Sequence, residues 1–357
     1  MSLALVWSDR SLDHAPPPGH PERVERGLVM RAVVDAWREG GGMVLEPAAA
    51  TRADIERVHA PGYVDRLAAV AGSPAALDLD TYMSPGSWDA AQLAAGAAIT
   101  AVDCVLGSGL QSAQNAHFAD LTPPGAAFAL VRPPGHHALR DRAMGFCLLN
   151  NVAIAVAHAL ARGLTRVAVV DYDVHHGNGT QWAFYDDPRV LVISAHQYPF
   201  YPQTGSAGEC GVRAGEGFTV NLPLSAGATD ADYLLLIDRV VEPILDAFAP
   251  DLLVLDVGFD AHDLDPLAHM HVSTAGFGAM AARLRAAAIR SCGGRVVLAT
   301  EGGYHLDALR DSLQATIDVF AGPPAPIPDP PGEPPTRSGT LALETVLAAQ
   351  KRYWSTL

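Results

Sequence analysis

An apolar stretch that ends abruptly in aspartates and histidines constrains this chain more than any other feature. It covers residues 166–177 and reads Arg-Val-Ala-Val-Val-Asp-Tyr-Asp-Val-His-His-Gly. Valine and alanine bounded by turn residues indicate a strand that is buried on both faces of a parallel sheet. The polar residues then lie at the carboxyl end of that strand, where open α/β sheets bind their ligands.

These polar residues have the chemistry of a metal site. Alternate residues of a strand point to the same side, so we expect Asp171, Asp173 and His175 to converge. Aspartate and histidine together form a ligand set that suits zinc. A strand end with solvated polar residues is the simpler interpretation of a single Asp-x-His. Four such residues behind a buried strand favour the metal site, and Gly177 and Gly179 predict a turn directly after it.

Composition limits the class of protein. A chain of 357 residues leaves open one large domain or two ordinary ones. A hydrophobic content of 49% and a charged content of 18% fit a globular protein with a large core. The formal net charge of −15 argues against a nucleic-acid surface, which needs clustered lysine and arginine. The same charge would tolerate cationic substrates such as lysine-bearing peptides or polyamines.

Cysteine usage and the N-terminus point to a reducing, aqueous environment. The scattered cysteines form no Cys-x-x-Cys pair, so neither a thiolate metal site nor a disulfide framework is expected. They are Cys104, Cys147, Cys210 and Cys292. The N-terminal residues lack the basic start and long apolar core of a signal peptide, and no apolar stretch approaches membrane-span length. We therefore expect a soluble cytoplasmic protein without a membrane partner, and a homo-oligomer stays open.

Short apolar runs alternate with amphipathic stretches along most of the chain. Strands are predicted at Leu3–Trp7, Ala127–Arg132, Arg166–Asp171, Val190–Ser194, Leu252–Val257 and Arg295–Thr300. Helices are predicted near residues 21–39, 88–108, 149–162, 230–248, 274–291 and 304–320. This alternation implies βαβ units, and hence a parallel sheet with helices on both faces.

The last part of the chain differs in composition. Residues Gly322–Pro335 are rich in proline, which predicts an extended connector. The amphipathic segment Leu341–Tyr353 predicts a helix that packs back on the sheet. No boundary divides the sheet itself. We therefore expect one main domain over residues 1–320, a connector over 321–338 and a C-terminal helix over 339–357.

Two further clusters follow predicted strands and supply acid–base and ligand groups. Residues 131–137 read Val-Arg-Pro-Pro-Gly-His-His, and a histidine there is the default general acid or base. A tandem histidine pair is often incidental, but the stiff Pro-Pro-Gly turn before His136 and His137 favours function. Residues 252–262 form a buried run that ends in carboxylates, so Asp260 can complete a set of three metal ligands with Asp173 and His175. Catalytic zinc sites keep three protein ligands and one open position.

Two more clusters could shape a pocket. Residues 299–304 end in Glu-Gly-Gly-Tyr, and the hydroxyl of Tyr304 could donate to a developing oxyanion. Residues 144–151 contain Phe146, which could wall a narrow channel, although a core phenylalanine is an equally good interpretation. The number of metal ions separates two chemistries. A dimanganese hydrolase would need a second carboxylate where His262 stands, so one metal ion is favoured.

Taken in order, these clusters resemble one enzyme family, the zinc-dependent histone deacetylases. The motifs that carry the resemblance are Arg132-Pro-Pro-Gly-His-His137, Gly145-Phe-Cys147, Asp171-x-Asp-x-His-His-Gly-Asn-Gly179, Gly258-Phe-Asp-Ala261 and Glu301-Gly-Gly-Tyr304. The likeness extends to residues 19–23 (Gly-His-Pro-Glu-Arg) and 201–205 (Tyr-Pro-Gln-Thr-Gly), so it covers about residues 1–320. Asn178, where class I members carry aspartate, is typical of the class II branch and its bacterial amidohydrolase relatives. The resemblance implies the arginase/deacetylase fold, a single α/β domain with a central eight-stranded parallel sheet and helices on both faces.

The resemblance also implies a catalytic role for each matching residue. Asp173, His175 and Asp260 would hold one zinc ion. Asp171 would pair with His136, whereas His137 would act as general base and then as general acid. Tyr304 would stabilise the oxyanion, and His176 would be structural. Zinc polarises a carbonyl and lowers the pKa of bound water, so the implied reaction is amide hydrolysis.

Substrate-binding residues follow from the same comparison. Gly145, Phe146 and Tyr201 would line a tunnel for an acyl-lysine side chain. Asp80 would sit at the rim and bind a peptide backbone. Polyamine-selective relatives carry a glutamate after the Asp-Pro pair, and Leu267 occupies that position here. We therefore expect acyl-lysine or a simple acyl amide to be preferred over an acetylated polyamine.

Potassium is the second ion that the resemblance implies. One structural site would use the Asp171 carboxylate, the Ser194 hydroxyl and backbone oxygens of Asp173, His175 and Ala195. A second monovalent site would lie around residues of the following loop and strand. Those residues are Phe184, Asp187, Val190 and Phe218.

Three residues depart from the family pattern. Asp256 stands where a serine is common and adds a carboxylate near the end of a predicted strand. Gln203 replaces a glycine usual in the Tyr-Pro-Gly-Thr-Gly loop, and His305 follows Tyr304 where asparagine or threonine is usual. None of the three removes a catalytic group, but each could alter the pocket or its rim.

We therefore interpret the chain as a hydroxamate-sensitive, zinc-dependent amidohydrolase of bacterial type, which removes acetyl or related acyl groups from acyl-lysine. An acetylpolyamine or small acyl-amide deacetylase is the first alternative. A dimanganese ureohydrolase and a non-catalytic acyl-lysine binding module are two others. The binding module would usually have lost Tyr304, a histidine or a metal ligand, and all of these are present.

Overall fold

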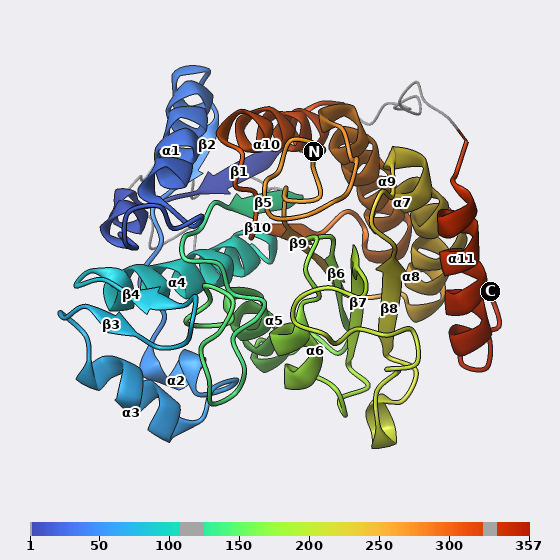
Figure 1. Cartoon of the computed structure of the whole chain (residues 1–357), viewed down its shortest axis with the longest axis horizontal. Coiled ribbons are helices and arrows are strands. Elements are labelled where there is room, and N and C mark those ends of the chain that lie inside the picture. Colours follow the sequence, from blue (N-terminus) through green and yellow to red (C-terminus); the bar gives the residue numbers. More distant parts are fainter. Residues whose placement is uncertain (1, 108–124, 324–333) are drawn as a thin grey trace.

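Eight parallel strands form one sheet at the centre of the molecule (Figure 1). The computed structural model describes residues 2–107, 125–323 and 334–357. The strand order is β2-β1-β5-β10-β9-β6-β7-β8. The strands are β1 (Leu3–Val6), β2 (Met43–Leu45), β5 (Ala126–Ala129), β6 (Val167–Asp171), β7 (Val190–Gln197), β8 (Thr219–Leu224), β9 (Leu252–Val257) and β10 (Val296–Thr300). The predicted eight-stranded parallel sheet is confirmed.

Two strands of this sheet were not among the sequence predictions, and both lie at its edges. β2 has only three residues, and β8 reads Thr-Val-Asn-Leu-Pro-Leu, with polar residues and Pro223 inside it. Proline cannot donate to a ladder and is tolerated on an edge strand. The central strands are mainly apolar because both faces are buried, whereas an edge strand leaves a weaker pattern. A separate antiparallel pair, β3 (Ala75–Ala76) and β4 (Tyr82–Met83), forms a small hairpin.

Helices cover both faces of the sheet (Figure 1). One layer consists of α1 (Val24–Glu39), α7 (Asp230–Leu236), α8 (Glu242–Phe248), α9 (Thr274–Cys292), α10 (Leu306–Ala321) and α11 (Arg337–Gln350). The other consists of α2 (Arg52–Ile55), α3 (Pro61–Ala69), α4 (Ser87–Val105) and α5 (Asn151–Ala161), and the short α6 (Asn178–Ala183) follows β6. Alternate residues of each strand enter opposite layers: Leu3 and Leu5 pack with the first, and Ala4 and Val6 with the second.

Two predicted helices have different limits in the structure. The segment 230–248 is not one continuous helix, because a π-helical turn at Ile237–Val241 separates α7 from α8. Pro243 follows that turn and lacks the N–H that an uninterrupted α-helix would use there. The helix predicted at 304–320 begins at Leu306, where the His305 Nδ1 accepts from the Ala308 N–H at 3.3 Å. Tyr304 therefore lies in a loop.

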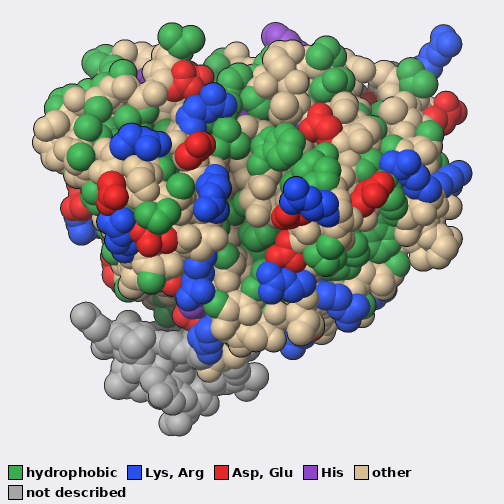
Figure 2. All heavy atoms as spheres, turned by 90° about the horizontal axis from the view of Figure 1, so that it is seen from below, with side chains coloured by type: hydrophobic (Ala, Val, Ile, Leu, Met, Phe, Trp, Pro, Cys, Tyr) green, Lys and Arg blue, Asp and Glu red, His purple; other side chains and the backbone are tan. Residues whose placement is uncertain are grey.

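The C-terminal helix begins earlier than its amphipathic pattern suggested. α11 starts at Arg337, where the Thr336 hydroxyl accepts from the Gly339 N–H at 3.0 Å, and it packs against β8 and α7. Most of the proline-rich connector lies outside the described residues, so the division at residues 320 and 338 stays a prediction. Among the helices of the described ranges, none is long and apolar enough to cross a membrane. On the face seen in Figure 2, basic and acidic side chains are interspersed with apolar ones.

A buried ion cluster joins the N-terminal segment to the loops at the carboxyl edge of the sheet. Glu22 accepts from the Nε and Nη2 atoms of Arg132 at 2.7 and 2.8 Å, and from the Nη1 atom of Arg26 at 2.8 Å. All three side chains are fully buried, and His14 Nε2 lies 3.2 Å from the same carboxylate. Burial alone would raise the pKa of Glu22, but Arg132, His14 and Arg26 hold it far below its ordinary value.

Replacing Glu22 by glutamine should therefore destabilise the fold. Two buried guanidinium groups would lose their counter-charge, which typically costs about 3–5 kcal/mol of unfolding free energy. Urea denaturation of E22Q measures this loss, with Glu25→Gln, an exposed residue of α1, as the matched control. Because the pKa of Glu22 is lowered in the folded protein, the parent is stabilised relative to E22Q at neutral pH. This difference in unfolding free energy should shrink as the pH falls below about 4.3, the ordinary glutamate pKa. A loss below about 1 kcal/mol at neutral pH, the value of a surface ion pair, would contradict this account.

Candidate active site

The sheet topology brings the sequence clusters together. β5, β10, β9 and β6 are consecutive neighbours in the sheet, and all run in the same direction. The histidine pair follows β5, the Gly-Gly-Tyr turn follows β10, Asp260 follows β9, and Asp173 with His175 follows β6. Four groups that are far apart in sequence therefore meet at one edge of the sheet, where parallel strands end.

Three side chains form a group that could hold a metal ion. The ligand atoms of Asp173, His175 and Asp260 all lie within 4.8 Å of one another. The Nδ1 atom of His175 is 3.1 Å from Asp173 Oδ1 and 3.2 Å from Asp260 Oδ2. The expectation that strand alternation brings Asp171, Asp173 and His175 together is wrong. β6 ends at Asp171, so the loop rather than the strand brings Asp173 and His175 together, while Asp171 turns to another partner.

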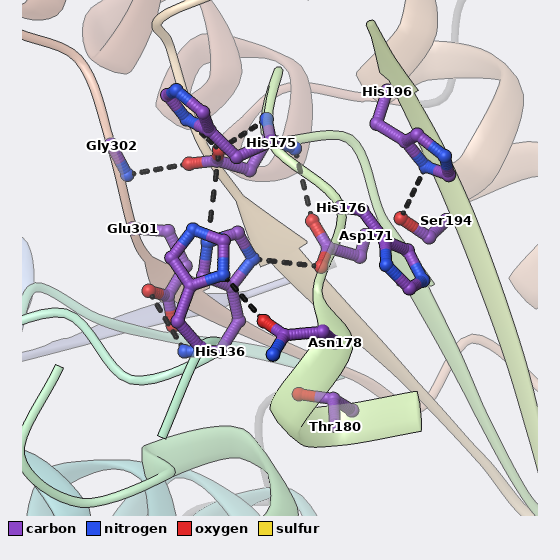
Figure 3. Close-up of polar contacts among 12 residues, drawn as sticks. His136, Asp171, His175, His176, Asn178, Thr180, Ser194, His196, Glu301 and Gly302 are labelled. Atoms are coloured by element: carbon purple, nitrogen blue, oxygen red, sulfur yellow. Dashed lines mark hydrogen bonds and ion pairs between the residues drawn. The ribbon is translucent and has the colours of Figure 1, made fainter. Parts of the chain in front are cut away.

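The donor set fits a cation on its own chemistry. Two carboxylates face one imidazole nitrogen in a buried site. Burial and the charge of Asp173 raise the pKa of Asp260 to about 7, which a bound cation would reverse. Both carboxylates are also held by backbone N–H groups. Gly302, which is labelled in Figure 3, donates to Asp173 Oδ2 at 2.8 Å, and Val174 donates to Asp260 Oδ1 at 2.9 Å.

Two glycines leave the space in which these carboxylates lie. A Cβ atom at Gly258 would stand 2.1 Å from Asp173 Oδ2, and one at Gly302 would stand 2.0 Å from Asp260 Oδ2. Real Cβ atoms essentially never come so close to another atom, so any larger residue would displace a ligand. The first glycine of the Gly-Phe-Asp motif and the first glycine of the Glu-Gly-Gly-Tyr motif are therefore sterically required at this site.

The two adjacent histidines have different partners. His136 Nδ1 lies 3.0 Å from Asp171 Oδ2, the expected pairing, whereas His137 Nδ1 lies 2.7 Å from the side-chain oxygen of Asn178 (Figure 3). The sequence marked Asn178 only as a sign of the class II branch, so its contact with His137 is new. Burial would lower the pKa of His136, but the charges of Asp173 and Asp171 raise it to about 10. Burial and the charges of His136 and His175 hold the pKa of His137 well below its ordinary value.

A narrow pocket of about 90 Å³ leads to these groups. All of its lining residues except Pro134 and Gly302 were among the predicted site residues. The lining consists of Asp80, Pro134, His136, His137, Gly145, Phe146, His175, Tyr201, Leu267, Gly302 and Tyr304. The ring of Phe146 meets that of Tyr304 edge-on, with 5.8 Å between centroids, and the ring of Tyr201 meets that of His137 at 5.1 Å. Burial raises the pKa of Tyr304 well above its ordinary value, so its hydroxyl keeps its proton.

The departures from the family pattern have local explanations. Gln203 adopts a backbone φ of 71°, the left-handed region that glycine enters without strain. His305 caps α10 and does not line the pocket. Asp256 is fully buried, and its carboxyl group lies within hydrogen-bonding reach of the equally buried Glu301 side chain. Burial, followed by the charge of Glu301, raises the pKa of Asp256 well above its ordinary value, which favours the neutral acid.

Other predicted residues lie beside this centre. The ligand atoms of His136, Asp171 and Asp256 also lie within 4.8 Å of one another, but His136 is engaged with Asp171 by a hydrogen bond. Ser194 is the register partner of Asp171 on the neighbouring strand β7. His176 belongs to a polar network, in which its Nδ1 lies 2.8 Å from the Thr204 hydroxyl.

The fold and this buried group of donors define an α/β protein with a candidate metal site at the carboxyl edge of its parallel sheet. Residues 18–320 match the model of the histone deacetylase domain, and the chain belongs to that family. A probable deacetylase of Archaeoglobus fulgidus is 40% identical over 329 residues, which cover 90% of this chain and 87% of that protein. The histone deacetylase-like amidohydrolase of Pseudomonas aeruginosa is 40% identical over 87% of this chain and 80% of its own length.

Two further matches extend the comparison. The solved structure of the HDA15 HD domain superimposes with a TM-score of 0.87 at 36% identity and covers 100% of this chain and 98% of that one. The human polyamine deacetylase HDAC10 is 36% identical over 99% of this chain, which spans 51% of that protein. Family membership and fold therefore agree with the sequence resemblance, and the relatives of this chain are named as deacetylases or amidohydrolases.

The glycine contacts lead to a test of the metal site. Gly258→Ala would push a methyl group against the Asp173 carboxylate, so the affinity for a divalent ion should fall about 10- to 100-fold, as when a group supporting a ligand is removed. Metal content after dialysis at graded free zinc measures this. Gly208→Ala is the control, because its new Cβ would have no neighbour closer than 4.0 Å. Equal zinc affinity for parent and G258A would contradict the assignment.

Proposed function

We propose that this protein is a zinc-dependent amidohydrolase that removes acetyl or related acyl groups from the side-chain amine of acyl-lysine. One observation carries the proposal. His175, a member of the three-donor group, lines one narrow pocket together with His137 and Tyr304. A zinc ion held by Asp173, His175 and Asp260 would supply a Lewis acid that polarises the amide carbonyl and lowers the pKa of water. Asp and His ligands, three in number, are typical of catalytic zinc.

His137 is placed to move the proton. Its Nδ1 faces the Asn178 oxygen at 2.7 Å, so Nδ1 carries the hydrogen and Nε2 is free to accept a proton from water. The low pKa of His137 keeps it unprotonated before the reaction, as a general base must be. The same imidazole, once protonated, returns the proton to the leaving amine. His136 holds its own proton against Asp171 and so discourages a second positive charge on its neighbour.

Tyr304 is placed to stabilise the developing oxyanion. It lines the pocket together with His137, and its hydroxyl makes no hydrogen bond to any other described residue, so it can donate to a bound substrate. A donor of this kind typically contributes about 3 kcal/mol to transition-state stabilisation. Acetate and a free amine are the products.

The pocket shape favours a linear, unbranched side chain. Its volume of about 90 Å³ is far below the roughly 300–1,000 Å³ of ordinary small-molecule sites. Phe146 and Tyr201 form its aromatic walls, and Leu267 forms part of its apolar rim. Asp80 also lines it and could accept hydrogen bonds from a peptide backbone. An acyl-lysine fits this arrangement, with its aliphatic stem along the walls and its peptide outside.

An acetylated polyamine is the second candidate substrate. The similarity to a protein named polyamine deacetylase favours it, and so does the excess of acidic residues in the chain. The apolar Leu267 argues the other way, because it offers no charge to a distant ammonium group. The sequence of the rim therefore makes acyl-lysine the first choice.

Potassium is proposed as a structural ion beside the zinc site. The side chains of Asp171 and Ser194 occupy facing positions of β6 and β7, which supports a shared cation with backbone oxygens of Asp173, His175 and Ala195. A second monovalent site around Phe184, Asp187, Val190 and Phe218 rests on the family resemblance alone. A dimanganese centre is disfavoured because the neighbouring donor His136 is already bonded to Asp171.

Mutations separate metal binding from turnover. Asp173→Ala should empty the metal site, whereas His137→Ala should retain one zinc per chain and lose about 10²- to 10⁴-fold in kcat, the usual contribution of general acid–base catalysis. Zinc content and hydrolysis of an acetyl-lysine peptide measure both effects. His271→Ala, a surface histidine, serves as control. Full activity of zinc-free Asp173→Ala protein would exclude the mechanism, and an inactive parent that binds acyl peptide would favour a binding module.

Leu267 offers a test of substrate class. Leu267→Glu places a carboxylate at the rim, where attraction to a distant ammonium should raise kcat/KM for an acetylpolyamine, relative to an acetyl-lysine peptide, by about tenfold or more. Leu267→Gln keeps the shape without the charge and should leave the ratio near that of the parent. Equal ratios for the two variants would show that charge at this position does not select the substrate.

A further inference from the structure

Tyr304 reaches the pocket from a turn that has no regular structure of its own. It follows two glycines and precedes α10, which begins at Leu306. Gly303 adopts a φ of 117°, a conformation that only glycine enters readily. Such a residue leaves the peptide unit between Gly303 and Tyr304 free to rotate. Something other than local conformation must therefore set the direction of the Tyr304 side chain.

Two charged side chains hold opposite ends of this one peptide unit. The Arg26 Nε donates to the carbonyl oxygen of Gly303 at 2.7 Å, and the Tyr304 N–H donates to Asp265 Oδ2 at 2.6 Å. Arg26 is fully buried, and Asp265 is 7% exposed. The Arg26 guanidinium also lies 4.9 Å from the centre of the Tyr304 ring, so it contacts the side chain as well as the backbone.

The arrangement resists a flip of the peptide plane. A half-turn would aim the Gly303 carbonyl oxygen at the carboxylate of Asp265 and the Tyr304 N–H at the guanidinium of Arg26. Both contacts would then be repulsive, in a site where charges are little screened by water. Hydrogen bonds to charged partners are also stronger than those between neutral groups. Only the observed orientation satisfies both charges.

Asp265 also reaches the substrate rim. Its Oδ1 accepts from the Leu267 N–H at 3.0 Å, and its Oδ2 accepts a second, longer bond from the His305 N–H at 3.3 Å. Leu267 and Tyr304 both line the pocket. One buried carboxylate thus fixes the backbone of a rim residue and of the tyrosine that is proposed to stabilise the oxyanion.

We propose that Asp265 is a positioning residue that, with Arg26, clamps the Gly303–Tyr304 peptide unit and thereby holds the Tyr304 hydroxyl in the pocket. The inference rests on the proposed function, because it assigns Asp265 a part in the same reaction through Tyr304. Among the described residues, the hydrogen bonds of Asp265 come from the backbone N–H groups of Leu267, Tyr304 and His305 and from no proposed metal ligand. Its effect on turnover should therefore depend on the presence of the Tyr304 hydroxyl.

A double-mutant cycle on the zinc-loaded full chain tests this dependence. Asp265→Asn keeps the shape of the side chain but removes its charge and places an amide donor against backbone N–H groups. We expect kcat for an acetyl-lysine peptide to fall about 10- to 100-fold. In the Tyr304→Phe background the same change should cost less than about threefold, because the hydroxyl it positions is already absent. Zinc content should stay at one per chain.

Asp263→Asn is the matched control, since Asp263 lies in the same loop, is exposed and contacts His271 rather than the pocket loop. It should leave kcat and KM unchanged. If Asp265→Asn costs the same in both backgrounds, or acts only on KM, the residue does not work through Tyr304 and the proposal falls. A loss of zinc that accounts for the loss of activity would overturn it equally.

An NMR measurement distinguishes failure of the clamp from failure of the proposed activity. With ¹⁵N-labelled tyrosine, only nine backbone signals appear, and Tyr304→Phe identifies the one from Tyr304. A bond to a buried carboxylate should place that amide proton far downfield of the others, and Asp265→Asn should move it upfield. An ordinary position in the parent protein overturns the clamp, even if the variant does not fold. A downfield signal in a parent that hydrolyses no acyl amide leaves the clamp in place and removes the proposed function.

Discussion

The site depends on two buried carboxylates that face one imidazole nitrogen. Asp173 and Asp260 repel each other unless a positive charge lies between them, and the Nδ1 atom of His175 lies toward the same point, where a bound cation would favour its neutral form. Backbone N–H groups of Gly302 and Val174 fix the two carboxylates before any ion binds. This preorganisation means that the protein has already lost the conformational freedom that metal binding would otherwise remove.

The surrounding charges give the two adjacent histidines, His136 and His137, opposite pKa shifts. His136 shares a hydrogen bond with a carboxylate and holds its proton, whereas His137 shares one with a neutral amide and stays free of a second proton. The charges of Asp173 and Asp171 raise the pKa of His136, whereas burial and the charges of His136 and His175 lower that of His137. A cation bound by the three ligands would lower the pKa of both His136 and His137, and its effect would be larger on the histidine that lies nearer to it.

Much of this arrangement could be read from the sequence, because the relevant signals are local. The run at β6 is apolar until it ends in Asp171, the run at β9 is apolar up to Asp256, and the His-His and Gly-Gly-Tyr motifs lie in the loops after β5 and β10. Eight-strand topology was supplied by the family resemblance, since β2 and β8 are too short or too polar to be recognised alone. The π-helical turn and the start of α10 were missed for a similar reason. Both depend on where a proline or a capping side chain falls within an otherwise continuous pattern.

What the sequence could not supply are contacts between residues far apart in the chain. Arg26 and Asp265 are separated by more than 200 positions, yet both hold the peptide unit before Tyr304. No periodicity marks such a pair, because each residue follows the local pattern of its own segment. Asn178 stood in a quoted motif, but its contact with His137 requires the three-dimensional path of the loop after β6. Asp256 was noticed as unusual, and only its complete burial explains why the neutral acid is favoured.

The most direct measurement is anomalous X-ray diffraction at the zinc absorption edge from crystals of the metal-loaded protein. The account requires one strong peak, about 2.0–2.2 Å from His175 Nδ1 and from one oxygen each of Asp173 and Asp260. A peak away from these three side chains would contradict it. So would two transition-metal peaks about 3.5–4 Å apart, the spacing of a dinuclear hydrolase.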